Sequence, residues 1–465
     1  MKRTIYIYHT NDIHSHFENW PKMVSFLKQQ RKIHQQRNET MLLFDIGDFV
    51  DRFHLITEAT NGKANVELLN DLGYDAVTIG NNEGITLPHD HLNQLYEKAA
   101  FPVLVANLFK RSGERPKWAQ PYCIIELSNT FKIGVIGLTI HFTKFYELLG
   151  WTIENPFDVL KKVLTELKPQ VDFIILLSHL GIHEDEQIAE MFTDIDLILG
   201  AHTHHLLSKG QYIRNTLLCG AGKYGEYIGV VKLQIDEQER VIKKEASVIK
   251  TAELQECQEA KQKLENLCRQ SEKLLDETVV ELTEDLELHW FAPSRFPKLL
   301  AEALKEWCNG DIGMVNAGVL LEPLYKGIVT KKDLHRICPH PINPCKVYLR
   351  GDELKEVILQ AATERMKTLQ IKGLGFRGKI MGQMVYDEGV QFETEMMNDG
   401  LEHIQHIFIN GEPIDLEKIY AVATIDMFTF GNLYPEIRRA ERKEYYMPEF
   451  LRDVLAWKLT NLYKT

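Results

Sequence analysis

Metal-ligating side chains follow directly after a series of short apolar strands in this chain. Runs such as Met41–Ile46 and Phe173–Leu177 are largely apolar, and segments with helical periodicity separate them. Continuous apolar strands that alternate with helices are typical of an α/β fold with strands buried on both faces. Because functional residues in such sheets gather beyond the carboxyl ends of the strands, we expect the following polar segments to lie together. The segments are Asp12–His14, Gly47-Asp48, Gly80–Glu83, Ser178-His179 and Gly200–His204.

These segments supply a ligand set that suits two neighbouring divalent cations. Two such cations repel one another, and a carboxylate with one oxygen toward each can bridge them. Asp48 is the candidate bridge, because it ends a buried strand. A mixed nitrogen and oxygen set suits Mn, Fe, Zn or Co better than the all-oxygen sites of calcium or magnesium. Besides Asp48, we expect Asp12, His14 and His204 at the first cation, and Asn81, His179 and His202 at the second.

Length and composition limit the classes of function that remain. A chain of 465 residues is expected to form two or three domains. A net charge of −12 without a long basic run argues against binding nucleic acid through its phosphate backbone. The 7 cysteines form no regular framework, and we see neither a secretory leader nor an apolar run long enough to span a membrane. We therefore expect a cytoplasmic protein without a membrane or nucleic-acid partner.

The domain organisation is predicted from a charged helix in the middle of the chain. Residues 252–277 have one apolar stripe and no glycine or proline, which favours a helical linker. We expect a catalytic domain at 1–250, a linker at 251–279 and a second domain at 280–465. Leu217–Cys219 and Ile228–Ile235 are expected as later strands of one catalytic layer. In the second domain we expect helices at 296–307 and 352–367, and strands near 345–349, 379–386, 405–409 and 419–425.

The order of the polar segments resembles the calcineurin-like metallophosphoesterases, and most closely the bacterial 5′-nucleotidase / UDP-sugar hydrolase family. Tyr8–His16 matches that family's opening motif, Gly200–His204 its last ligand motif, and Ala221–Gly225 the segment that follows. The resemblance covers most of residues 1–236. It implies a four-layer αββα catalytic domain, joined by a helical linker to a smaller α/β substrate-binding domain. It also implies the two metal-ligand groups given above, with Asp48 shared between them.

One residue departs from the family at the reacting phosphate. Where the family has a histidine after Gly-Asn, this chain has Asn82. In the family that histidine stabilises the transition state or protonates the leaving group; an amide can donate a hydrogen bond but cannot deliver a proton near neutral pH. With Asn81, Asn82 and Asp48 as the catalytic group, we expect a slower enzyme, a preference for better leaving groups, or an acid from elsewhere. Candidates for that acid are His9, His16, His54 and His205.

The second domain carries a weaker match. Asn316-Ala317-Gly318 resembles a family loop that approaches the substrate phosphate, and Leu321 stands where the family often has an arginine. Phe376 and Phe428 lie in the regions that supply two rings around a nucleobase, although either could instead belong to the core. Arg377 could replace the missing arginine or could be an exposed loop residue. Our predicted substrate-binding residues are Asn316, Gly318, Phe376, Arg377 and Phe428.

The function expected from these features is hydrolysis of phosphate esters with two divalent metal ions. We expect a 5′-nucleotidase-like phosphatase for nucleotides or related small metabolites, in which a metal-bound hydroxide attacks phosphorus. One alternative is a phosphodiesterase or pyrophosphohydrolase for cyclic nucleotides or nucleotide sugars, whose leaving groups need less help from an acid. A second alternative is a catalytically weak metabolite-binding protein. The complete set of metal-ligand candidates argues against this last alternative, because a binding protein needs no second cation.

Overall fold

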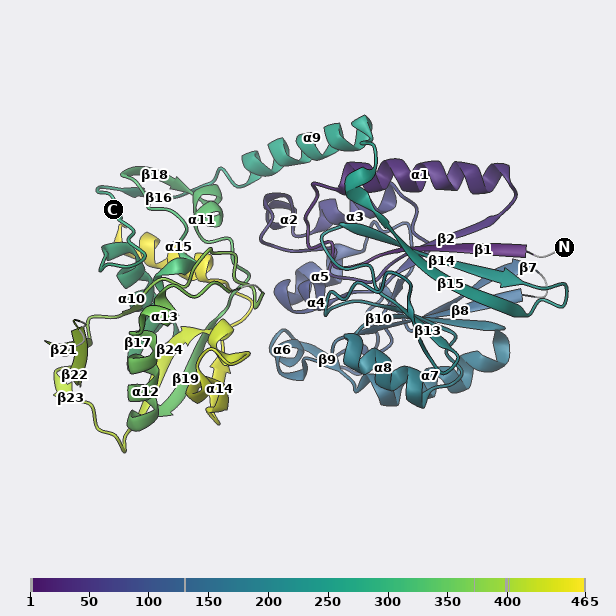
Figure 1. The fold of residues 1–465 in the computed structure, drawn as a ribbon. Coiled ribbons are helices and arrows are strands. Elements are labelled where there is room, and N and C mark those ends of the chain that lie inside the picture. The colour runs from purple at the N-terminus through teal and green to yellow at the C-terminus, as the bar shows by residue number, and fades with distance from the viewer. Residues whose placement is uncertain (1–2, 129–130, 372, 398–399, 401, 464–465) are drawn as a thin grey trace. The chain divides into compact units, whose positions relative to one another are not determined.

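The computed structural model describes residues 3–128, 131–371, 373–397, 400 and 402–463, and its chain divides into two compact units (Figure 1). The first unit is Met1–Ser271 and the second is Glu272–Thr465. The helix expected over 252–277 is shorter, because Thr251–Glu253 forms a 3-10 turn and α9 spans Gln258–Leu274. The bounds that we gave for a catalytic domain, a linker and a second domain stay a prediction.

A seven-stranded sheet of the first unit begins with the N-terminal strand. Its order is β15-β14-β1-β2-β3-β4-β6, in which β1, β2, β3, β4 and β6 run parallel and β14 and β15 are antiparallel additions at one edge. The parallel part places the carboxyl ends of β1, β2 and β3 next to one another. The strands are β1 (Arg3–Thr10), β2 (Thr40–Asp45), β3 (Ala76–Val77), β4 (Val103–Leu104), β6 (Ala119–Gln120), β14 (Tyr227–Ile235) and β15 (Val241–Lys250).

A six-stranded sheet forms the other half of this unit, in the order β12-β13-β11-β10-β8-β7. One expectation was wrong: Leu217–Cys219 lies in this sheet and Ile228–Ile235 in the other, since both runs are apolar and apolarity alone does not assign a strand to a sheet. The strands are β7 (Tyr122–Ser128), β8 (Phe131–Thr139), β10 (Phe173–His179), β11 (Leu197–Gly200), β12 (Gln211–Ile213) and β13 (Thr216–Cys219).

The two sheets pack face to face and are covered by helices on their outer faces. Phe44 from one sheet and Val135 and Leu177 from the other belong to one buried apolar cluster. Figure 1 shows α1 on one outer side and α7 and α8 on the other, which confirms the four-layer αββα architecture. The helices are α1 (Trp20–Gln36), α2 (Leu55–Thr60), α3 (Lys63–Asn70), α4 (Asn81–Thr86), α5 (His89–Leu95), α6 (Thr143–Leu148), α7 (Pro156–Leu167) and α8 (Ile182–Met191); β5 (Leu108–Lys110) and β9 (Trp151–Ile153) form a small ribbon.

The second unit is built around a five-stranded sheet in the order β20-β17-β24-β19-β25. The sheet consists of β17 (Ile312–Asn316), β19 (Pro344–Arg350), β20 (Met384–Tyr386), β24 (Ile419–Ile425) and β25 (Lys443–Tyr445). Smaller sheets consist of β16 (Thr278–Leu282) with β18 (Gly327–Thr330), and of β21 (Val390–Met396), β22 (Glu402–Ile409) and β23 (Glu412–Pro413). The helices are α10 (Arg295–Cys308), α11 (Lys331–Ile337), α12 (Gly351–Ala361), α13 (Glu364–Lys367), α14 (Pro435–Arg439) and α15 (Leu451–Leu462).

Two expected elements of the second unit differ from the structure. The helix expected over 352–367 is two helices, α12 and α13, because the Thr363 side chain accepts a hydrogen bond from the backbone N–H of Met366 and begins a new helix. The strand expected over 379–386 is limited to β20, because Gly382 (φ +69°) turns the chain before it.

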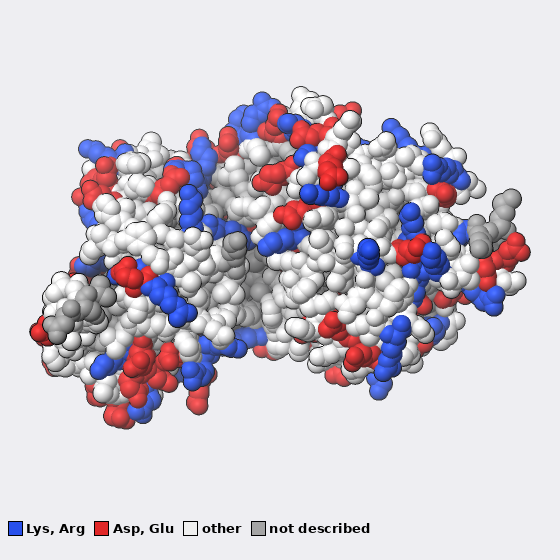
Figure 2. Space-filling model, viewed as in Figure 1, with Lys and Arg blue, Asp and Glu red and all other residues white. Residues whose placement is uncertain are grey.

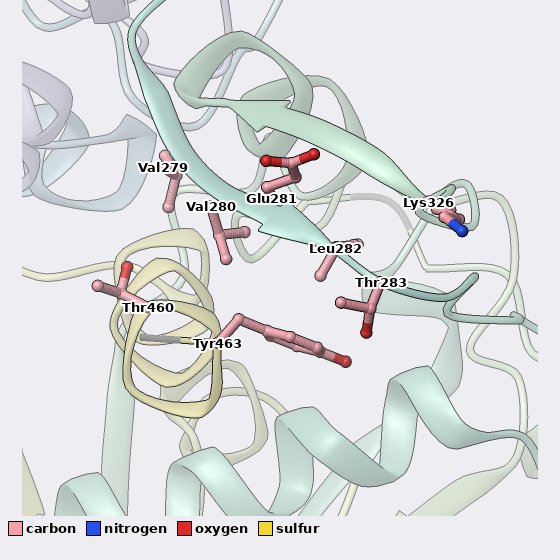
Figure 3. Close-up of a pocket in the computed structure, with 8 residues that line it drawn as sticks. All are labelled: Val279, Val280, Glu281, Leu282, Thr283, Lys326, Thr460 and Tyr463. Carbon is pink, nitrogen blue, oxygen red and sulfur yellow. The ribbon is translucent and has the colours of Figure 1, made fainter. Parts of the chain in front are cut away.

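A cavity of about 460 Å³ lies between β16 and the end of α15 (Figure 3). Alternate side chains of β16 point to opposite sides, so that Val280 and Leu282 face the ring of Tyr463 and Glu281 points away. Among the described residues, those that line the cavity include no histidine and no cysteine, and none of them belongs to a metal-ligand group.

Two properties of the described residues concern nucleic-acid and membrane partners: the distribution of surface charge and the apolarity of the helices. Figure 2 shows acidic and basic side chains interspersed over the face in view, without a continuous basic stripe. None of the helices in the described part of the chain has the length and apolarity needed to cross a membrane.

Candidate metal centre

The predicted ligands of the first unit meet in two groups. The first group is Asp12, His14 and His204, and the second is Asp48, His179 and His202; within each group, the potential ligand atoms all lie within 4.8 Å of one another. Asn81 joins the second group, because its Oδ1 lies 2.9 Å from Nδ1 of His202. Residues that follow strands of the two different sheets thus lie close together, as the two predicted ligand sets require.

The parallel strands explain this convergence. Thr10 of β1 pairs with Asp45 of β2, and Asp45 pairs with Val77 of β3, so the segments after these strands leave the sheet at one edge. In the other sheet, Ser178 of β10 pairs with Gly200 of β11, which places the two histidine segments side by side. The site therefore lies where the carboxyl edges of two packed sheets meet.

The backbone of most ligands is held in an uncommon conformation. A left-handed φ between 50° and 72° occurs at five ligand positions: Asp12, His14, Asp48, His202 and His204. Non-glycine residues rarely adopt this conformation, and they concentrate at functional sites where the surrounding structure enforces it. Here the backbone N–H of Asp12 donates to the Gly47 carbonyl at 3.0 Å, and that of His14 donates to the Asp48 carbonyl at 2.7 Å. The two ligand segments thus fix one another.

Asp48 occupies the position of a bridge between the two groups. Its Oδ2 lies 3.6 Å from Nε2 of His14 and 3.4 Å from Nε2 of His179. The carboxylate is oriented by Asn82, whose backbone N–H donates to Oδ1 at 2.7 Å and whose side-chain amide donates to Oδ2 at 2.8 Å. One carboxylate thus contacts a histidine of each group.

Residues behind the ligands set the direction of the histidine rings. Nδ1 of His179 lies 2.6 Å from the carbonyl oxygen of Ile46, so this nitrogen carries a proton and Nε2 is the nitrogen that faces the cluster. That Nε2 is buried and has no hydrogen-bond partner among the described residues. Nδ1 of His14 lies 3.2 Å from Asp51 Oδ2, an arrangement that commonly orients metal-binding histidines. A buried nitrogen without a partner, aimed at two carboxylates, fits a metal ligand.

The electrostatics of the cluster favour bound positive charge. Burial opposes ionisation of Asp48, but His179 and His14 outweigh it and lower the pKa of that carboxyl. Burial by itself would lower the pKa of His179, yet the carboxylates of Asp48 and Asp12 raise it to about 10, so without a cation Nε2 carries a proton that a bound cation would displace. Burial lowers the pKa of His202 to about 4, and His179 contributes further, so His202 is a neutral ligand near neutral pH. Ionised carboxylates and a neutral imidazole are the forms that bind cations.

Comparison with known proteins agrees with this geometry. Residues 5–206 match the calcineurin-like phosphoesterase family, and residues 278–433 match the C-terminal domain of 5′-nucleotidases. YunD of Bacillus subtilis, described as an uncharacterized metallophosphoesterase, is 54% identical over 461 residues, which are 99% of this chain and 100% of that protein. The chain is a metallophosphoesterase of the 5′-nucleotidase family. It is therefore a metal-dependent hydrolase of phosphoric esters, in a family that uses two divalent metal ions.

More distant relatives of this metallophosphoesterase share its architecture. The 5′-nucleotidase of Bos taurus is 25% identical over 413 residues, which are 75% of this chain and 70% of that protein. The structure of the 5′-nucleotidase precursor of Thermus thermophilus has a TM-score of 0.60 at 20% identity, covering 99% of this chain and 97% of that chain. For the NAD nucleotidase of Haemophilus influenzae the TM-score is 0.69 at 17% identity, with coverage of 99% and 97%. These structures show the two-domain α/β fold.

The histidines considered as substitute acids lie in different environments. His9 is buried on β1, and burial lowers its pKa to about 4. His54 caps α2 by accepting a hydrogen bond from the Ile56 N–H, and burial again lowers its pKa to about 4. His16 lies between the rings of Tyr224 and Phe53, with centroids 3.8 and 5.0 Å away.

The last of these histidines is exposed and lies next to a ligand. Nδ1 of His205 is 2.9 Å from Thr203 Oγ1. Because burial keeps His9 and His54 neutral near pH 7, neither of these two is a source of a proton at that pH.

Several residues support the site in ways that the sequence pattern did not predict. Glu83 accepts hydrogen bonds from the backbone N–H groups of Asp48 and Gly80, and Asp51 supports His14. His141 and Phe142 follow β8, whose Thr139 pairs with the ligand His179, and the Phe142 ring lies 5.8 Å from the His202 ring. Applying the same strand-end rule to the apolar run 133–136 would have identified this segment. The roles of Glu83 and Asp51 depend on side-chain geometry that the pattern does not contain.

Gly80 allows two ligands to approach the backbone, and replacing it should disable the site. A Cβ at this position would overlap Asp48 Oδ1 and would lie 2.5 Å from Nε2 of His179. We expect Gly80→Ala to lower kcat by at least about 100-fold, because small displacements of catalytic groups cost rates of that order. Phosphatase assays on metal-supplemented protein, together with metal analysis, would check this. A variant with full metal content and normal kcat would contradict it.

The predicted substrate-binding residues lie in the second unit and are described there by themselves. Asn316 is buried at the end of β17, and its amide donates to the Met381 carbonyl at 2.8 Å. Gly318 packs against the same segment, since a Cβ there would lie 2.6 Å from the Met381 carbonyl oxygen. The backbone N–H of Arg377 donates to Nδ1 of His340 at 2.9 Å. The structure thus brings the loop around Asn316 next to residues 377–382.

The two predicted aromatic rings are covered in this structure. Phe376 is 3% exposed and stacks on His340 with centroids 5.3 Å apart, and Phe428 is 0% exposed and meets Tyr434 edge to face at 5.0 Å. A nucleobase could stack on either ring only after that ring had been uncovered. Their role in substrate binding, like that of Asn316, Gly318 and Arg377, stays a prediction.

Proposed function

We propose that this protein hydrolyses phosphate monoesters of nucleotides or related small metabolites at the centre formed by the two ligand groups. The observation that carries the proposal is the position of Asp48, whose carboxylate contacts a histidine of each group. Asp12, His14, Asp48 and His204 would hold one cation, and Asp48, Asn81, His179 and His202 the other. Bound divalent cations supply Lewis acidity to the phosphoryl oxygens and a hydroxide nucleophile at neutral pH.

The chain's own contribution is to hold these ligands in place. Asn82 fixes both oxygens of Asp48, Asp51 orients His14, and the Ile46 carbonyl orients His179. These contacts exist before substrate binds, so little reorganisation is needed when the phosphate arrives.

The chemistry of Asn82 determines which leaving groups we expect the enzyme to release most readily. Its side-chain amide is buried and donates to Asp48, and its other side-chain contact among the described residues is His14 Nδ1 at 3.4 Å. An amide cannot protonate a departing alkoxide. Leaving groups of low pKa should therefore be released more readily than the ribose hydroxyl of a nucleoside monophosphate.

The same residue favours a second candidate function, cleavage of phosphodiesters or pyrophosphates. A phosphorylated leaving group, as in a nucleotide sugar, departs with less help from an acid. The relatives named above include 5′-nucleotidases and an NAD nucleotidase, whose name refers to a dinucleotide.

A substrate panel with one variant tests the proposal. We would compare AMP, 2′,3′-cyclic AMP, UDP-glucose and p-nitrophenyl phosphate on wild-type and Asn82→His protein, supplemented with Mn, Co or Zn. We expect wild-type turnover of p-nitrophenyl phosphate and AMP, with AMP slower. Asn82→His should raise the AMP rate by about tenfold or more and change p-nitrophenyl phosphate little, because a general acid assists poor leaving groups most.

Other outcomes separate the alternatives. Faster turnover of UDP-glucose or the cyclic nucleotide than of any monoester would favour the second candidate function. A metal-loaded protein that cleaves none of the four compounds would favour a metabolite-binding role and would contradict our proposal. Equal gains on AMP and p-nitrophenyl phosphate in Asn82→His would argue against our account of this residue.

A further inference from the structure

The loop Ala221–Gly225 is hydrogen-bonded to two segments of the metal centre, the one that carries His14 and the one that carries His204. The side chain of Asn11, next to Asp12, accepts from the Ala221 N–H at 3.1 Å and donates to the Gly222 carbonyl at 2.7 Å. The Gly222 N–H in turn donates to the carbonyl of His205, next to His204, at 3.2 Å. The loop therefore has a fixed position beside the first ligand group.

Tyr224 adds further contacts between this loop and the segment Asp12–His16. Its backbone N–H donates to the carbonyl of Asp12 at 2.8 Å, and its φ of +58° is uncommon for a bulky residue. Its ring centroid lies 5.9 Å from that of His14 and 3.8 Å from that of His16. Such a conformation persists only where neighbouring contacts enforce it, and these contacts place the ring beside a metal ligand.

Lys223 places a positive charge at this position, and no carboxylate in the described part of the chain pairs with it. Its ammonium lies 4.5 Å from the centroid of the Tyr224 ring, and the residue is half-buried. Of the carboxylates in the part of the chain described here, none forms an ion pair with it. In a protein with a net charge of −12, a lysine held by a ring beside the site and left unpaired is available for an anion that arrives from solution.

We propose that Lys223 contacts the substrate through a phosphoryl oxygen that the two cations leave unbound. This inference rests on the proposed function. A phosphate monoester dianion has more negative charge than a diester, so a third cationic group adds most to its binding. An ammonium on a flexible stem suits this contact, because it binds phosphate as a point charge and can leave the face of the ring to reach it.

The test compares Lys223→Met, Lys223→Arg and the control Lys232→Met. Lys232 also places its ammonium against a ring of the first unit, 5.7 Å from the Tyr6 centroid, but β14 carries it away from the ligand segments. Calorimetry would measure inorganic phosphate binding to metal-loaded protein. Kinetics would compare p-nitrophenyl phosphate with bis(p-nitrophenyl) phosphate, which release the same leaving group and differ in charge. Metal content would be measured for every variant.

We expect Lys223→Met to weaken phosphate binding by about tenfold, the usual worth of a charge-assisted hydrogen bond, with metal content unchanged. Its kcat/KM should fall by a similar factor on the monoester and by much less on the diester. Lys223→Arg should retain most of both properties, and Lys232→Met should behave as wild type.

Unchanged phosphate binding in Lys223→Met would overturn the inference, and so would an equal loss on both esters or a loss of metal. The calorimetric result does not depend on turnover. If the substrate panel failed but phosphate binding still required Lys223, the inference would stand without the proposed function.

Discussion

Asp48→Asn should lower kcat by at least about 10³-fold, which corresponds to about 4 kcal/mol in the activation barrier. The substitution keeps the volume of the side chain but removes the negative charge and one of the two acceptor oxygens. Both are needed if the residue is to balance the charge of two neighbouring cations. Because Asp48 contacts histidines of both groups, its loss affects both cation positions at once. Steady-state rates on metal-supplemented protein would give the magnitude.

Metal analysis and a control make this result specific. We expect the bound metal in Asp48→Asn to fall from about two to about one equivalent per chain, because the remaining ligands no longer share an anion. Asp158→Asn, at an exposed carboxylate in the first turn of α7, should retain metal and activity. A normally active Asp48→Asn protein would remove the basis of the site assignment.

Removal of metal from the wild-type protein should have an effect of similar size. We expect chelation followed by dialysis to reduce phosphatase activity to the level of the uncatalysed background, a loss greater than about 10³-fold. Readdition of Mn, Co, Zn or Fe should restore it, because the ligand segments are fixed by backbone hydrogen bonds that need no cation. Activity before chelation, after chelation and after readdition is the measurement.

The same experiment has a readout in stability. Ligands that bind only the folded state stabilise it, by about 3 kcal/mol at a concentration of about 100 times Kd. The melting temperature should therefore fall on chelation, while circular dichroism stays that of a folded protein, since the apolar core between the sheets contains no ligand. Full activity in metal-free protein would refute the two-metal reading of the site.

The convergence of the proposed ligand residues could be predicted because the rule behind it is topological. Parallel strands bring their carboxyl ends to one edge, so polar residues that follow apolar runs meet even when they are far apart in sequence. Asp12 and His204 are an example, with 3.5 Å between Asp12 Oδ1 and His204 Nε2. The sequence also indicated the departure at Asn82, but not that its amide binds Asp48.

Other features could not be predicted, for physical reasons that differ. Apolar composition does not distinguish the sheet of Leu217–Cys219 from that of Ile228–Ile235, because both sheets bury their strands. An aromatic residue such as Phe376 suits a core as well as a binding face, and only packing decides between them. The support that Asp51 gives to His14 depends on side-chain direction, which no spacing of residues contains.

The left-handed backbone at the ligand positions sets activity against stability. Each such residue costs of order 1 kcal/mol relative to glycine, which tolerates the same conformation. Glycine at one of these positions would relieve that cost but would remove a side chain that holds the cations, whose binding stabilises the folded state by more. A gain in melting temperature from such a replacement should therefore appear, if at all, only in metal-free protein.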